Sequence, residues 1–184
     1  MTNRILTVSL LAAVTLLATG EYSGRRAPSF SLPDANIVYY DILDYRGKVL
    51  LLDFMSAGCQ HCREAAPVFE KVKQKYGNRV AILSIVTFPT DNQRTVSEYI
   101  KDTKTTVPIL YDSGQVTGNY LKATPTDSKR DMPRVFVIDP SGMIRNDFGY
   151  GPETKEIFDG PGLFAEIDKA MVKKTPPAAA AAKK

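Results

Sequence analysis

The residues with the clearest chemistry in this sequence are its only two cysteines, Cys59 and Cys62, which are separated by Gln60 and His61. At this spacing one thiolate can attack a partner sulfur, and the other can resolve the mixed disulfide that results. A tetrahedral zinc site needs four protein ligands, or three plus water, and His61 is the only histidine that could join the two cysteines. The pattern predicts a redox pair that closes as a Cys59–Cys62 disulfide, with no metal and no organic cofactor.

This redox motif lies where a strand is expected to run into a helix. Residues 49–54 form an apolar run of strand length, and apolar residues recur at helical spacing over residues 60–76. Free backbone N–H groups and the dipole at the start of a helix stabilise a thiolate over a thiol. We therefore expect Cys59, at the exposed start of the helix, to attack, and the more buried Cys62 to resolve the mixed disulfide.

Two polar residues near the pair are predicted to tune it. Asp53 lies in an apolar strand, where an unpaired carboxylate is costly and its pKa should rise, which suits a group that takes a proton from Cys62. His61, protonated or simply polar beside Cys59, would stabilise the thiolate and make the disulfide more oxidising. The alternatives are a solvated aspartate at the strand edge and a solvated histidine in the first helical turn.

The rest of the chain alternates segments of strand and helix character, which predicts an α/β fold with a mixed central sheet. Strands are expected at 37–40, 49–54, 80–87, 107–111, 135–138 and 143–148. Helices are expected at 60–76, 92–102, 115–121 and 163–172. A polar segment at 122–131 precedes the last two strands.

The two ends of the chain predict export. A short basic start, an uncharged apolar run and small residues at 18–20 are typical of a signal peptide over residues 1–20, with an uncleaved anchor as the alternative. Residues 21–174 are expected to form one domain, and the Pro-, Ala- and Lys-rich stretch 175–184 a disordered tail. These features predict a periplasmic or other extracytoplasmic protein.

The formal net charge of +4 comes from the ends of the chain. Setting aside Arg4 and the four lysines after residue 172 leaves 19 basic residues against 20 acidic ones. A nearly neutral body gives no reason to expect a nucleic-acid partner.

With these marks the chain resembles the thioredoxin superfamily, specifically its exported TlpA/ResA-like thiol-disulfide oxidoreductases. The resemblance covers residues 27–173. Its marks are Ala-Pro-Ser-Phe-Ser-Leu at 27–32, Arg-Gly-Lys at 46–48, the redox motif, Pro67 in the following helix, the unit 80–102 and Met-Pro at 132–133. It implies a thioredoxin-like fold with an inserted segment before a cis-proline.

The resemblance also implies which residues meet the substrate. Pro133 would be cis and lie against the redox pair, so that Met132 offers its backbone to an extended substrate. Gly58 and Gln60 flank Cys59 and would belong to the same surface. A histidine just before the second cysteine is typical of oxidases and isomerases in this superfamily, whereas many TlpA/ResA-like reductases carry proline there. Asp53 matches the buried aspartate of thioredoxin.

Three departures from the family limit how far its substrates can be transferred. Gly58 replaces the tryptophan that usually precedes the first cysteine, and Met55 replaces an aromatic residue. Ala65 replaces the buried glutamate of ResA-like proteins, and the neighbouring Glu64 is expected to face water. We therefore expect a flatter and more open rim around the site.

These observations predict a thiol-disulfide oxidoreductase that acts on protein thiols or disulfides through a mixed disulfide, as either a reductase or an oxidase or isomerase. We expect it to be a monomer that works with a membrane or periplasmic redox partner. One alternative is a copper protein that binds Cu(I) through the two cysteines and His61, with Met55 or Met132. Another is a thiol peroxidase, although the residues before Cys59 include no proline.

Overall fold

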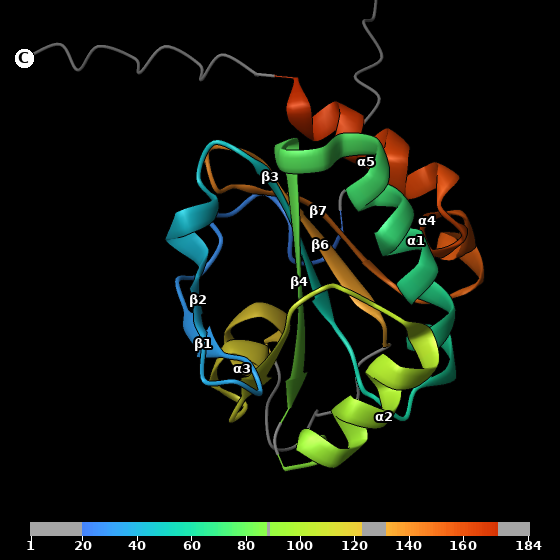
Figure 1. Ribbon diagram of the computed structural model, residues 1–184. Coiled ribbons are helices and arrows are strands. Elements are labelled where there is room, and N and C mark those ends of the chain that lie inside the picture. The colour runs from blue at the N-terminus through green and yellow to red at the C-terminus, as the bar shows by residue number, and fades with distance from the viewer. Residues whose placement is uncertain (1–19, 88, 123–131, 173–184) are drawn as a thin grey trace, which may run out of the picture.

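A five-stranded mixed sheet forms the centre of the fold (Figure 1). The computed structural model of the protein describes residues 20–87, 89–122 and 132–172. The strand order is β5–β4–β3–β6–β7, with bounds Ile109–Asp112, Val80–Thr87, Val49–Phe54, Arg134–Ile138 and Ile144–Gly149. Strands β3, β4 and β5 are parallel, whereas β6 runs antiparallel to both β3 and β7. The predicted α/β class with a mixed central sheet is confirmed.

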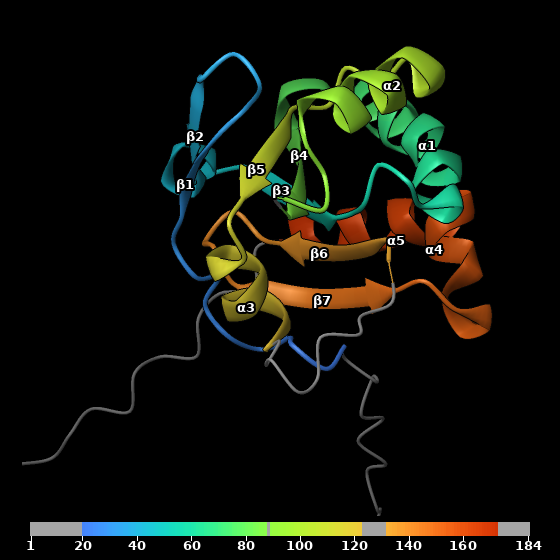
Figure 2. The same cartoon turned by 90° about the horizontal axis from the view of Figure 1, so that it is seen from below.

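Helices cover one side of the sheet, and a short helix with a hairpin covers the other (Figures 1 and 2). On the first side lie α1 Gln60–Tyr76, α2 Gln93–Thr103, α4 Lys155–Asp159 and α5 Pro161–Met171. On the second side lie α3 Gln115–Leu121 and the hairpin of β1 Ser31–Pro33 with β2 Tyr39–Asp41. Short 3-10 helices occur at Ile42–Tyr45, Gly77–Arg79 and Pro152–Thr154. Because both of its faces are covered, β3 is buried along its whole length.

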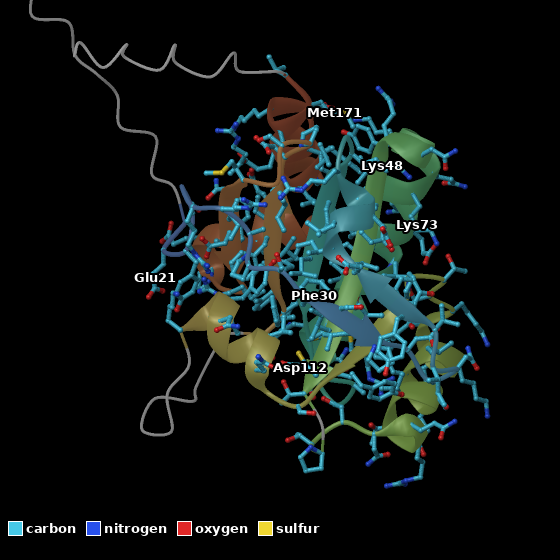
Figure 3. The ribbon with its side chains drawn as sticks, turned by 90° about the vertical axis from the view of Figure 1, so that its left-hand side faces the viewer. Glu21, Phe30, Lys48, Lys73, Asp112 and Met171 are labelled. Atoms are coloured by element: carbon cyan, nitrogen blue, oxygen red, sulfur yellow. The ribbon has the colours of Figure 1, made fainter. Side chains whose placement is uncertain are left out.

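Alternation along β3 decides which of its side chains reach the helix that carries the cysteines. Val49 and Leu51 belong to the apolar cluster packed beneath α1 and α5. Leu50 belongs to the cluster on the opposite face, together with Phe30, which is labelled on the near side of the sheet in Figure 3. Since successive side chains of a strand point to opposite faces, Asp53 shares the α1 face with Val49 and Leu51.

Residues 20–27 run along the outer edge of β7. The backbone N–H of Gly24 donates to the carbonyl of Ile144 over 3.0 Å, and the N–H of Ile144 donates to the carbonyl of Arg25 over 2.9 Å. The N–H of Tyr22 bonds the Asp147 carboxylate over 2.8 Å. This segment therefore fastens the start of the described chain to the sheet.

The first hairpin differs from the sequence prediction. The strand expected at 37–40 is wrong in position, because β2 begins at Tyr39 and Ile37 lies in a turn with a φ of 62°. The Asp34 side chain accepts hydrogen bonds from two backbone N–H groups of this turn, over 2.8 and 3.0 Å, which stabilises the turn in place of extended backbone. Strand β1 and helix α4 have no counterpart among the predicted elements.

Several predictions concern residues outside the described ranges. Of the predicted signal peptide only Gly20 is described, and of the polar segment at 122–131 only Lys122. The predicted tail at 175–184 is not described. Within the described ranges, no helix combines the length and apolar character needed to cross a membrane.

Candidate active site

Cys59 occupies the N-cap position of α1. Its Sγ accepts a hydrogen bond from the backbone N–H of Cys62, with 3.2 Å between nitrogen and sulfur. The Cys59 thiol also lies 3.6 Å from the carbonyl oxygen of Met132, to which it donates. The residue is half-buried, so its sulfur is within reach of a partner. A thiolate at this place gains from the helix dipole and from the N–H bond, which suits an attacking group.

Cys62 lies one turn into the helix and faces the core, where it is 1% exposed. Burial raises the pKa of its thiol far above the ordinary value, and the negative charge of Asp53 raises it further. At neutral pH Cys62 therefore remains a thiol unless a base takes its proton. The structure separates the two free cysteines into an accessible one and a protected one.

Asp53 lies on the face of β3 that α1 covers and is 1% exposed. Its Oδ2 accepts a hydrogen bond from the Ser84 hydroxyl over 3.0 Å, while its buried Oδ1 has no hydrogen-bond partner among the described residues. Burial raises the pKa of Asp53 to about 7, although the bond from Ser84 lowers it. A carboxyl with this pKa can take up and release a proton near neutral pH.

His61 is exposed and lies against residues other than Cys59. Its Nδ1 is 3.1 Å from Oε2 of Glu64, and its ring stacks on that of Tyr150, with centroids 3.8 Å apart and planes at 14°. Glu64 also accepts a hydrogen bond from the Gln60 side chain over 3.0 Å. These bonds, from Gln60 first and then from His61, lower the pKa of Glu64. Within the described part of the chain, no hydrogen bond joins His61 to Cys59.

The Met132–Pro133 segment lies beside the redox pair. Its peptide bond is cis, and Met132 packs against the apolar cluster around Cys62. The carbonyl of Pro133 accepts a hydrogen bond from the backbone N–H of Tyr150 over 3.0 Å, which ties this segment to the end of β7. The Met132 carbonyl, which the resemblance assigns to substrate binding, thus lies close to the Cys59 sulfur.

The three positions at which the sequence departs from the family pattern differ in their exposure, and only Gly58 lies at the surface beside Cys59. Gly58 is exposed, and a Cβ added to it would meet no atom within 4 Å. Met55 is 3% exposed and therefore lies in the core. Ala65 is buried, whereas Glu64 faces solvent. The space next to Cys59 on the Gly58 side is open.

Three residues of the site have no counterpart in the sequence prediction. The Asp91 carboxylate accepts the backbone N–H of Ala57 over 3.0 Å, and Arg63 donates to the carbonyl of Ala57 over 2.9 Å. These two bonds hold the loop that leads to Cys59. Tyr150, the third residue, comes from the segment after β7. No local pattern of the sequence connects Asp91 or Tyr150 to the motif.

Among the residues that the structure describes, no group of three or more histidine, cysteine, aspartate or glutamate side chains is arranged to hold a metal ion. Two thiols and one buried carboxyl lie together at this site, and the His61 imidazole is exposed beside them. Their arrangement allows thiol-disulfide exchange with an internal base.

Comparison with known proteins also indicates thiol-disulfide chemistry. The pattern of the AhpC/TSA family matches residues 23–147. Thioredoxin-like protein YneN of Bacillus subtilis (strain 168) is 27% identical over 138 residues, covering 74% of this chain and 76% of YneN. Thiol-disulfide oxidoreductase ResA of Bacillus anthracis is 26% identical over 138 residues, covering 74% and 75% of the two chains.

A solved structure supports the fold. The thiol:disulfide interchange protein of the thioredoxin family from Chlorobium tepidum TLS superposes with a TM-score of 0.64 at 21% identity, over 79% of this chain and 95% of the other. The thioredoxin-like fold expected from the sequence is therefore confirmed.

Proposed function

The chain belongs to the AhpC/TSA family, and we propose that it is a thiol-disulfide oxidoreductase that acts on protein thiols and disulfides through Cys59 and Cys62. The observation that carries the proposal is the unequal placement of the two sulfurs. The half-buried Cys59 sulfur accepts a helix N–H over 3.2 Å. Cys62 is buried, and this burial together with the negative charge of Asp53 raises the pKa of its thiol. The relative ResA is named a thiol-disulfide oxidoreductase, which supports the same activity here.

These positions support the following steps when the protein acts as a reductase. The Cys59 thiolate attacks one sulfur of a substrate disulfide, and the second substrate sulfur leaves as a thiolate that takes up a proton. Asp53 removes the proton of Cys62, whose thiolate then attacks Sγ of Cys59. The Cys59–substrate bond breaks, the substrate leaves reduced, and the protein holds the Cys59–Cys62 disulfide. The reverse sequence oxidises a client dithiol and leaves the protein reduced.

The substrate surface of the proposal consists of backbone near Cys59. The Met132 carbonyl lies 3.6 Å from the Cys59 sulfur, and Pro133 follows it through a cis peptide bond. Gly58 leaves open space beside the sulfur, and Gln60 lies on the exposed first turn of α1. An extended peptide could lie across this surface with its cysteine at Cys59, so we assign these four residues to substrate binding.

The proposal includes a location and a partner class. The basic and apolar start of the chain supports export to the periplasm or another extracytoplasmic compartment, either with cleavage or as an anchor. A protein that reduces disulfides in an oxidising compartment needs an electron donor, so we assign it a membrane or periplasmic redox partner. We assign it no nucleic-acid partner and a monomeric state.

Trapping of the mixed disulfide tests this function. The Cys62→Ser variant keeps the attacking sulfur and lacks the resolving one, so incubation with a disulfide protein such as insulin should give a stable covalent adduct at Cys59. The Cys59→Ser variant is the matched control and should give none. An adduct on Cys59→Ser alone would overturn the assigned roles, and no adduct on either variant would overturn the proposed function.

The reduction potential of the pair then distinguishes the directions. It can be measured by equilibration in glutathione buffers followed by alkylation and mass analysis, in protein that begins near Glu21. A value close to that of thioredoxin, about −270 mV, indicates a reductase, whereas a value well above about −200 mV indicates an oxidase or isomerase. Stoichiometric copper retained through dialysis, or rapid consumption of hydrogen peroxide, would instead support the copper or peroxidase alternative.

A further inference from the structure

The contacts of His61 differ from those expected of a histidine that stabilises the neighbouring thiolate. One face of its ring is covered by Tyr150 at a centroid distance of 3.8 Å, and its Nδ1 is bonded to Glu64 over 3.1 Å. The partners of the Cys59 sulfur are the N–H of Cys62 and the carbonyl of Met132. The imidazole is thus engaged with two groups on the side of α1 that faces the end of β7.

Tyr150 itself is fixed from two further directions. Its backbone N–H donates to the carbonyl of Pro133 over 3.0 Å. Its ring packs on that of Phe158 in α4, with centroids 5.4 Å apart. A half-buried ring held in this way offers a defined surface to His61, and it connects the redox helix with the Pro133 segment.

We propose that Tyr150 is a positioning residue that, together with Glu64, withholds His61 from the Cys59 thiolate and makes the Cys59–Cys62 disulfide less oxidising than its Cys-Gln-His-Cys motif suggests. The inference rests on the proposed function and deepens it, because it favours the reductive direction. A protonated imidazole beside a thiolate stabilises the reduced form and so raises the reduction potential. An imidazole bonded to a carboxylate has its positive charge offset, and one stacked on a fixed ring cannot turn freely toward the sulfur.

A double-mutant cycle tests whether Tyr150 acts through His61. We would measure the equilibrium between the Cys59/Cys62 pair and glutathione for Tyr150→Leu, with His61 present and in the His61→Ala background. With His61 present, Tyr150→Leu should shift the equilibrium three- to tenfold toward the reduced protein, tenfold being about 30 mV. In the His61→Ala background the same substitution should cause no shift. Tyr150→Phe keeps the stacked ring and should match the wild type.

The possible results distinguish failure of this inference from failure of the proposed function. An unchanged equilibrium in Tyr150→Leu, or an equal shift in both backgrounds, would overturn the inference while the oxidoreductase assignment stands. A wild-type pair without any reversible couple would overturn the proposed function and the inference with it. Leucine keeps the backbone bond to Pro133 and an apolar contact with Phe158, so we expect the variant to fold. If Tyr150→Leu does not fold, Glu64→Gln on the exposed face of α1 can be measured in the same two backgrounds. The shift that Glu64→Gln causes in the glutathione equilibrium should be smaller in the His61→Ala background.

A second readout does not depend on the cysteines. His61 is the only histidine of the chain, so its ring protons give a single identifiable set of NMR signals in protein without a histidine tag. Stacking on Tyr150 should displace these signals by the ring current, and the displacement should persist in Tyr150→Phe and disappear in Tyr150→Leu. Identical His61 signals in the wild type and Tyr150→Leu would show that the stack does not exist in solution, and this too would overturn the inference.

Discussion

The Ser84 hydroxyl donates a hydrogen bond to Oδ2 of Asp53 over 3.0 Å, between two residues that are directly opposite in the β3–β4 register. Burial nevertheless raises the pKa of Asp53 from 3.8 to about 7. The native state therefore binds a proton at Asp53 more tightly than the unfolded chain does. The contribution of protonated Asp53 to the free energy of unfolding is fully present below pH 4 and decreases as the pH rises toward 7.

The first prediction concerns the Asp53→Asn variant of the reduced protein. The raised pKa corresponds to a cost of ionisation on the order of 4 kcal/mol in the folded state above pH 7. Asparagine cannot ionise, so the free energy of unfolding of the variant, relative to wild type, should increase between pH 4 and pH 8. Urea unfolding at a series of pH values measures this difference. Parallel pH profiles for the two proteins would mean that Asp53 titrates normally.

The second prediction concerns the rate at which the mixed disulfide is resolved. If Asp53 takes the proton of Cys62, Asp53→Asn should slow resolution of a Cys59–glutathione disulfide about 10²-fold at pH 7, with little change in the initial attack by Cys59. Rapid quenching and mass analysis follow both steps. Asp112→Asn is the control, since Asp112 is equally buried but accepts hydrogen bonds from the backbone N–H groups of Val116 and Thr117 in the first turn of α3. Equal resolution rates in the two variants would exclude Asp53 as the base.

Much of the fold could be predicted from local pattern alone. The strands at 49–54 and 80–87 are long apolar runs, and the helix at 60–76 has a clear period, so their assigned bounds match the structure. Strand β1 and helix α4, of three and five residues, are too short to show a period. The position of β2 depends on side-chain bonds of Asp34 that its sequence pattern does not reveal.

Residue spacing alone could predict the site only where its residues lie on one stretch of chain, whereas the place of Met132 beside Cys59 was expected from the family resemblance. Cys59, Cys62 and Asp53 are placed by a strand followed directly by a helix, and the roles proposed for them rest on that order. The contacts of His61 with Tyr150, and of Ala57 with Asp91, depend on how distant segments meet across the sheet. Residue spacing contains no information on such contacts, so the partners of His61 could not be predicted from the motif.

The third prediction concerns the loop before Cys59. Asp91 is 4% exposed and its carboxylate accepts the N–H of Ala57, so Asp91→Ala leaves a buried N–H without an acceptor. This should lower the free energy of unfolding by about 1–3 kcal/mol. Asp91→Asn retains an acceptor oxygen and should have a smaller effect in the same urea experiment. A loss in Asp91→Asn as large as that in Asp91→Ala would show that charge, and not the hydrogen bond, is what matters at this position.

The fourth prediction compares two arginines of the β6–β7 hairpin. Arg134 bonds the fully buried Asp147 carboxylate over 2.5 Å and is itself 12% exposed, whereas Arg145 pairs with Asp139 and is 41% exposed. Asp147 also holds the N–H of Tyr22, so its charge connects the segment 20–27 to the sheet. Arg134→Met leaves a buried carboxylate without its cation and should cost about 3–5 kcal/mol. Asp139 is also buried, but it keeps two backbone N–H bonds, and water screens the exposed Arg145 head, so Arg145→Met should cost less.

Two measurements check the last comparison. Urea unfolding gives the free energies of the two methionine variants, which have the same change in side-chain size and charge. Limited proteolysis reports on the segment 20–27, which should be cut more rapidly in Arg134→Met, because the Asp147 carboxylate that anchors Tyr22 becomes costly to keep buried. Equal losses of stability in the two variants would mean that the deeper burial of the Arg134–Asp147 pair adds nothing to its contribution to the free energy of unfolding. Faster cleavage in Arg145→Met would assign the anchoring of the segment to the more exposed pair.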